Sequence, residues 1–150
     1  MGAAGTTGPL RPAAPTARDL AAMRTVRVVD LDTGAELAAR AGVATSFWAR
    51  GKGLLGRRSL PIGEGLVIEH CRQVHMLFMA FPLDVLHVRR LSADEGRVAR
   101  VLADLPPYRI GPLVWQSDYV VELPAGTAAR TGTEVGHRIG LRAVEPAARG

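Results

Sequence analysis

Residues 74–88, Val-His-Met-Leu-Phe-Met-Ala-Phe-Pro-Leu-Asp-Val-Leu-His-Val, form a run that is too apolar to lie on a surface. Three polar side chains interrupt it: His75, Asp84 and His87. A buried carboxylate costs several kcal/mol unless it is paired. We therefore expect a central pair of strands, bent at Pro82 because proline cannot donate to a strand ladder, with Asp84 as a polar anchor that meets a partner.

The rest of the chain repeats short alternating segments between turn signals, which is typical of an antiparallel sheet protein. Asp32-Thr33-Gly34 and Ala93-Asp94-Glu95-Gly96 are the clearest turn signals. The predicted strands are 25–31, 36–43, 65–69, 74–79, 83–89, 97–105, 115–123 and 137–144. The sequence thus predicts a mainly β (α+β) fold, a compact antiparallel β sandwich or barrel-like domain.

Two segments have helical features. Residues 45–56 combine an N-cap candidate, apolar residues at helical spacing and a closing Gly56, and predict one short helix. Because Gly51 and Gly53 weaken a helix, an irregular helix is the alternative. Residues 125–130, closed by Gly132, predict one or two further helical turns.

Composition indicates one globular domain. The 150 residues are 47% hydrophobic and 22% charged, with a mean hydropathy of +0.10, which fits a chain with a real core. We predict a single globular domain at 23–145, preceded by a disordered tail at 1–22 and followed by a short tail at 146–150. We expect structure, or translation itself, to start at Met23. The sequence shows no secretory signal and no apolar run long enough to span a bilayer.

The net charge of +5 suggests an acidic partner, but the basic residues are scattered arginines without interleaved aromatic residues. This pattern argues against nucleic-acid binding. The single cysteine, Cys71, excludes an intrachain disulfide and suits a reducing compartment. We expect a cytoplasmic protein without a cofactor, whose protein or small-molecule partner the sequence does not identify.

Candidate chemical residues are few. The chain lacks the nucleophile elbow, zinc-protease, phosphate-loop and dinucleotide signatures. His70, Cys71, His75 and His87 form a metal-like group that Asp84 joins only through the fold. Their spacing matches no ligand pattern, and we interpret them as a structural polar network rather than as a metal or catalytic centre.

Glu122, in Val-Val-Glu-Leu, is a second carboxylate in an apolar strand. Asp84 and Glu122 suit an acid/base pair, but buried carboxylates more often accept backbone N–H bonds or pair with arginine. Arg50 and Arg57 are the first partners to consider. If Asp84 pairs with such a cation, Asp84→Ala is expected to cost about 3–5 kcal/mol of stability.

Three blocks in order resemble the domain of unknown function 192 family, small bacterial and archaeal proteins. They are Arg-Gly-Lys-Gly-Leu-Leu-Gly-Arg at 50–57, Phe-Met-Ala-Phe-Pro-Leu-Asp-Val at 78–85 and Val-Glu-Leu-Pro-Ala-Gly-Thr at 121–127, followed by Gly132 and Gly136. The resemblance covers residues 25–141. It implies a compact, mostly β domain with a short helix and no established enzyme activity.

The chain departs from the family pattern at two places. Ala80 stands where the family often has Lys or Arg, and His137 follows the closing glycine where Asp is common. The leading functional hypothesis is a non-enzymatic binding or interaction domain. The alternative is a hydrolase or metal-dependent enzyme that uses Asp84, His75 and Glu122.

Overall fold

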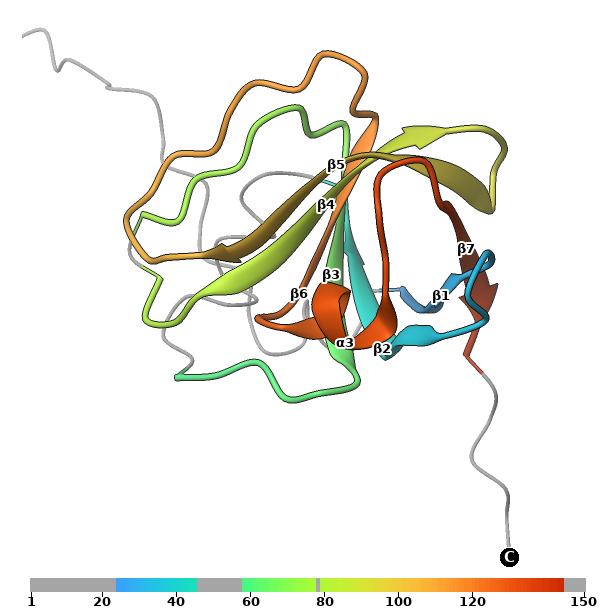
Figure 1. Ribbon diagram of the computed structural model, residues 1–150, viewed down its shortest axis with the longest axis horizontal. Helices are drawn as coiled ribbons and strands as arrows, with labels where there is room; N and C mark the ends of the chain where they lie inside the picture. Colours follow the sequence, from blue (N-terminus) through green and yellow to red (C-terminus); the bar gives the residue numbers. More distant parts are fainter. Residues whose placement is uncertain (1–23, 46–57, 78, 145–150) are drawn as a thin grey trace, which may run out of the picture.

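Seven strands close into a barrel in the computed structural model, which describes residues 24–45, 58–77 and 79–144 (Figure 1). Around the barrel the strands follow the order β1-β2-β3-β6-β4-β5-β7. The elements are β1 (Thr25–Asp30), β2 (Glu36–Ala44), β3 (Glu64–Glu69), β4 (Leu83–Arg90), β5 (Glu95–Leu105), β6 (Tyr119–Pro124), α3 (Thr127–Thr131) and β7 (Arg138–Ala143).

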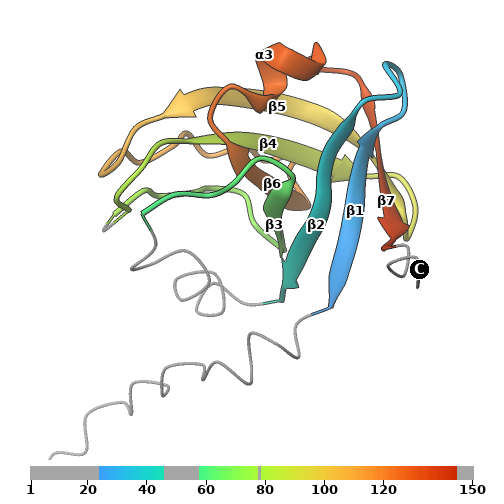
Figure 2. The ribbon, with the colours of Figure 1, turned by 90° about the horizontal axis from the view of Figure 1, so that it is seen from below.

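All neighbouring strands are antiparallel except β2 and β3, which run parallel. The hairpins β1–β2 and β4–β5 are joined by tight turns, and β7 pairs with both β1 and β5, which closes the barrel. Figure 2 shows α3 at one end of the barrel, next to β2 and β5. Of the two architectures that the sequence left open, the structure has the barrel.

The barrel interior is one hydrophobic core, built from the alternating inward side chains of the strands. Tyr119 is its largest fully buried side chain. Gly96 of β5 makes room for this ring: a Cβ at Gly96 would lie 2.5 Å from the Tyr119 hydroxyl and 2.4 Å from Val88 Cγ1. Burial raises the pKa of Tyr119 to about 12.

A second core lies on the outer face of β3, β6 and β4. Two segments, 70–77 and 106–117, cover this face, and we call them together the covering arm. Val74 and Met76 are the arm's inward side chains: they are fully buried and pack with Leu83, Val85 and Val120 of the strands. The sequence pattern of β4, apolar at almost every position, is explained because both of its faces are buried.

Most of the predicted strands are confirmed within one or two residues, but residues 74–79 are not a strand. Among the described residues of that segment, 74–77 and 79, His75 alone forms a β-bridge, with Ile110, and Met79 N donates to Met76 O in a turn. The predicted central strand pair is therefore wrong in its first half. The segment is apolar because it covers the outer core. An apolar run can do this without forming a strand ladder. The predicted strand 115–123 starts only at Tyr119.

The short helix predicted at 125–130 is confirmed as α3, which ends at Gly132 in a left-handed conformation. The helix predicted near 45–56 lies almost entirely outside the described residues, as do Arg50, Arg57, residues 1–22 and residues 146–150. Within the described part of the chain, no helix is both long and apolar enough to cross a membrane.

Candidate functional site

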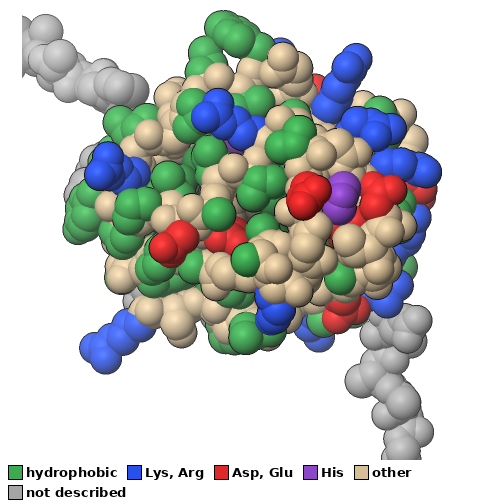
Figure 3. All heavy atoms as spheres, in the orientation of Figure 1, with side chains coloured by type: hydrophobic (Ala, Val, Ile, Leu, Met, Phe, Trp, Pro, Cys, Tyr) green, Lys and Arg blue, Asp and Glu red, His purple; other side chains and the backbone are tan. Residues whose placement is uncertain are grey.

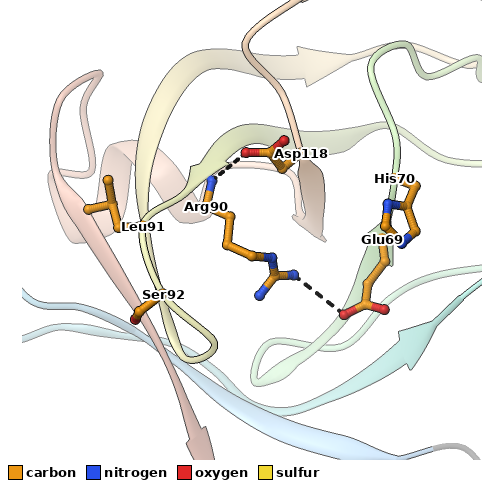
Figure 4. A pocket seen from close by; sticks show the side chains of 6 residues that line it. All are labelled: Glu69, His70, Arg90, Leu91, Ser92 and Asp118. Carbon is orange, nitrogen blue, oxygen red and sulfur yellow. Dashed lines mark hydrogen bonds and ion pairs between the residues drawn. The ribbon is translucent and has the colours of Figure 1, made fainter.

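A polar cleft of about 410 Å³ opens where three strands meet at one end of the barrel. Its lining residues are Glu69, His70, Arg90, Leu91, Ser92 and Asp118 (Figure 4). They come from the end of β3, from the end of β4 and its hairpin, and from the residue before β6. Because β6 lies between β3 and β4 in the barrel, residues far apart in the sequence converge here.

Arg90 is the central cation of this cleft. Its Nη2 donates to Glu69 Oε1 at 3.4 Å and its Nη1 to the carbonyl of Ala93 at 3.1 Å. Its guanidinium also lies 4.8 Å from the centre of the Tyr119 ring, a cation–π contact. These contacts hold the guanidinium beside Glu69, whereas it is the backbone N–H of Arg90 that meets Asp118 (Figure 4).

Asp118 and His70 also line the cleft, and His70 lies beside Glu69 (Figure 4). Asp118 Oδ2 accepts the backbone N–H of Arg90 at 2.7 Å, which fixes its position without using the guanidinium. His70 has a φ of 55°, an uncommon conformation for a residue other than glycine that often marks functional sites. A second hollow of about 280 Å³, lined by His70, Arg72, Ser117 and Asp118, adjoins it through two shared residues.

A buried histidine lies below this second hollow. His87 Nδ1 is 2.9 Å from Ser117 Oγ, and that hydroxyl donates to Cys71 O at 2.7 Å. Burial, with a smaller effect of Arg100, lowers the pKa of His87 to about 4, so the ring is neutral at physiological pH. Since the Ser117 proton is directed to a carbonyl, the ring supports the serine rather than activating it.

A third polar group joins the β1–β2 turn to the loop before β7. Asp30 is fully buried; its Oδ2 lies 2.9 Å from His137 Nδ1 and accepts the Thr133 hydroxyl at 2.9 Å. Its Oδ1 accepts the N–H groups of Asp32 and Thr33. Burial opposes the charge of Asp30, but these bonds outweigh it and lower its pKa, while the same contact raises the pKa of His137.

Asp30, Asp32 and His137 are also the one set of potential metal ligands among the described residues, with ligand atoms all within 4.8 Å of one another. Carboxylate and imidazole ligands suit several divalent metals. However, both oxygens of Asp30 already accept protein hydrogen bonds, so these bonds account for the cluster without an ion. The group predicted from sequence around Cys71 and His75 does not assemble into such a set.

Asp84, which the sequence singled out first, points into the barrel and binds backbone amides. Its Oδ1 accepts the N–H of Asp104 at 2.8 Å, and its Oδ2 accepts the N–H of Ala128 in the first turn of α3 at 2.9 Å. Gly126, at the N-cap, offers no side-chain acceptor. Asp84, from strand β4, therefore takes the place of a capping side chain for α3. These amides are the partners that the sequence required.

Glu122 is fully buried but faces the other side of the sheet. Asp84 pairs with Leu123 and Val85 with Glu122, and neighbouring residues of a strand point to opposite faces. Asp84 therefore faces the interior, and Glu122 faces the outer core together with Val85 and Val120. The structure does not bring the two carboxylates together, while His75 lies in the covering arm.

The cleft residues Glu69, Arg90 and Asp118 were not singled out by the sequence. Arg90 was counted only among the scattered arginines, and the two acids end or precede ordinary strands. His137 appeared only as a departure from the family pattern. One signal was available: each polar residue sits at the end of an apolar strand, where a barrel gathers its loops.

The fold and cleft define a class, a small closed β-barrel with a polar cleft at one end. Within that class, residues 29–141 match the model of the DUF192 family, described as an uncharacterized ACR, and the chain belongs to this family. None of the curated proteins matches the sequence.

Two crystal structures are similar. A protein of unknown function from Novosphingobium aromaticivorans is 26% identical, with a TM-score of 0.63 over 78% of this chain and 84% of that one. A putative transcription regulator from Sinorhizobium meliloti is 25% identical, with a TM-score of 0.61 over 79% of this chain and 95% of that one.

Proposed function

We propose that this protein is a non-enzymatic binding domain that holds a small polar ligand in the cleft around Arg90, and that it acts in the cytoplasm. The observation that carries the proposal is the arrangement of Arg90 between Glu69 and Asp118 around an open volume of about 410 Å³. The volume lies within the usual range for small-molecule sites.

The charges indicate the kind of ligand. Arg90 offers a planar fork of donors that suits a carboxylate or phosphate. Glu69 and Asp118 present acceptors on either side, which suit ammonium, hydroxyl or amide donors. A ligand with one anionic group and one or more donors, such as an amino acid or a sugar acid, satisfies both sets of groups.

A non-enzymatic role fits the chemistry of the cleft. Its described lining contains no cysteine or lysine, and its serine, Ser92, donates its hydroxyl to the exposed carboxylate of Asp94 at 3.1 Å within the hairpin. His87, the nearest buried imidazole described, hydrogen-bonds Ser117 beneath the adjoining hollow. The groups present bind and orient, and none is placed to attack.

The test is a thermal-shift panel of amino acids, sugar acids, small carboxylates and inorganic phosphate, with titration calorimetry on any compound that stabilises the protein. A saturating ligand raises stability by mass action. Arg90→Gln is expected to weaken that compound's binding by about tenfold or more, because a charge-assisted hydrogen bond is lost.

Arg40→Gln, which alters an exposed arginine on β2 away from the cleft, is the matched control and retains binding. Arg90→Lys keeps the positive charge but lacks the planar fork of donors. If it is folded and still binds weakly, the loss comes from the missing donors and not from unfolding. Equal affinity in wild type and Arg90→Gln would overturn the assignment of the cleft, as would a panel in which no compound stabilises the protein.

A further inference from the structure

The covering arm has a regular internal structure. Its two segments run antiparallel, with Met76 N donating to Arg109 O at 2.7 Å, Gly111 N to Val74 O at 2.8 Å and Val114 N to Arg72 O at 2.8 Å. Figures 1 and 2 both show the two segments, green and orange, side by side along one side of the barrel. The arm is therefore an ordered element with an inner and an outer side.

The outer side of the arm is unusually apolar. Tyr108, Ile110 and Trp115 are 65%, 64% and 68% exposed, and Leu77 and Leu113 are also exposed. They lie outside both cores, because Val74, Met76 and Val114 already fill the inner side. Single exposed apolar residues need no explanation, but a cluster of large ones marks an interaction surface.

The charge of the arm has one sign. Residues 70–77 and 106–117 contain Arg72 and Arg109 and no Asp or Glu. The Arg72 guanidinium lies 5.7 Å from the centre of the Trp115 ring, so the cation and the aromatic ring share one spot. At the base of the arm, Glu69 pairs with the Arg90 side chain and Asp118 accepts the Arg90 backbone N–H. Figure 3 shows mostly hydrophobic and basic side chains over the upper left of this face.

We propose that the outer side of the covering arm docks on a membrane surface that carries anionic headgroups. The apolar side chains would enter the headgroup region, where Trp and Tyr are favoured, and the arginines would pair with the lipid charge. A flat anionic surface fits better than a peptide, because none of the clefts described above is lined by the exposed apolar side chains of the arm.

The proposal is independent of the ligand cleft. Binding in the cleft is tested through Arg90, and docking through Ile110, Trp115, Arg72 and Arg109, so either can fail alone. The docking surface also requires no spanning segment, since interfacial attachment needs only apolar side chains and a favourable charge.

The experiment is co-sedimentation of the full chain with vesicles of phosphatidylcholine alone and of phosphatidylcholine with phosphatidylglycerol in equal parts. Wild type is expected to bind the anionic vesicles at low ionic strength and to be released by salt, because salt screens the arginines. The tryptophan emission is expected to shift to the blue on binding, and this shift is lost in Trp115→Phe.

Two double variants separate the contribution of the apolar side chains to vesicle binding from that of the arginines. Ile110→Ser with Trp115→Ser is expected to weaken binding by about tenfold or more, and Arg72→Gln with Arg109→Gln by roughly tenfold or more. The matched controls are Val135→Ser, which removes an exposed apolar side chain near β7, and Arg40→Gln. Both retain wild-type binding, and circular dichroism checks that every variant is folded.

Three outcomes would overturn the proposal. One is no binding to anionic vesicles at low ionic strength. Another is equal loss of binding in Val135→Ser and in the Ile110/Trp115 pair. The third is self-association in solution that the Ile110/Trp115 pair abolishes while vesicles remain unbound, which would assign the surface to contacts between copies of the chain.

Discussion

His87 and His137 show how the same side chain behaves in two regions of one barrel. His87 lies on the outer face of β4, fully buried, with a neutral serine as its partner. His137 lies at the edge, partly exposed, against the buried carboxylate of Asp30. Burial without a counter-charge lowers the pKa of His87, whereas the carboxylate raises the pKa of His137. The stability that each histidine contributes therefore changes with pH in opposite directions: that of His87 falls at acid pH, and that of His137 falls at alkaline pH.

The largest expected effect is a loss of folding stability at acid pH, caused by His87. Its pKa is about 4 when folded and 6.5 when unfolded, so its contribution is present above pH 6.5 and lost as pH falls toward 4. The loss amounts to about 3 kcal/mol. It is measured as the free energy of unfolding by urea at several pH values.

His87→Asn keeps a donor for Ser117 and removes the titrating group, so its acid-side slope is expected to be shallower than that of wild type. Val135→Ser changes an exposed side chain that does not titrate and serves as the control, with a wild-type slope. If wild type and His87→Asn have the same slope between pH 6.5 and 4, the buried ring does not remain neutral as described.

The next effect concerns Asp30, the carboxylate that distinguishes the second region. Asp30→Ala removes four hydrogen bonds from a fully buried site and is expected to lower the free energy of unfolding by about 2 kcal/mol. Asp32→Ala, at an exposed neighbour whose side chain accepts the Arg138 N–H, is expected to cost under about 1 kcal/mol. Equal costs would mean that the turn, and not the buried carboxylate, joins β1 to the loop before β7.

The sequence predicted the fold better than the site. Alternation and turn signals found the strands because period-two burial is a local property, readable at β1, where buried and partly exposed residues alternate. Residues 74–79 misled because an apolar run has the same appearance in a strand and in a segment that covers a second core. The helical turn at 127–131 was readable from Gly132.

The site was less predictable because it depends on which strand ends meet. The need for a partner of Asp84 was correctly inferred, but its partners are backbone amides of Asp104 and Ala128, which no side-chain pattern reveals. Likewise, Glu69, Arg90 and Asp118 become neighbours only because β6 inserts between β3 and β4. Charge pairing across a barrel follows from topology, and topology is the part that spacing does not encode.

The smallest expected effect is on the alkaline side and belongs to His137. Its folded pKa is raised above 6.5, so the stability from its ion pair is complete below pH 6.5 and lost as pH rises through the folded pKa. Asp30, with a lowered pKa, stays ionised throughout this range. His137→Asn offers an amide donor in place of Nδ1 and does not titrate. Urea unfolding from pH 6 to 9 is therefore expected to show a decline in wild type that is absent in His137→Asn. A decline of the same size in both would mean that the contact with Asp30 is a hydrogen bond of the neutral ring, and the contrast between the two histidines would then rest on burial alone.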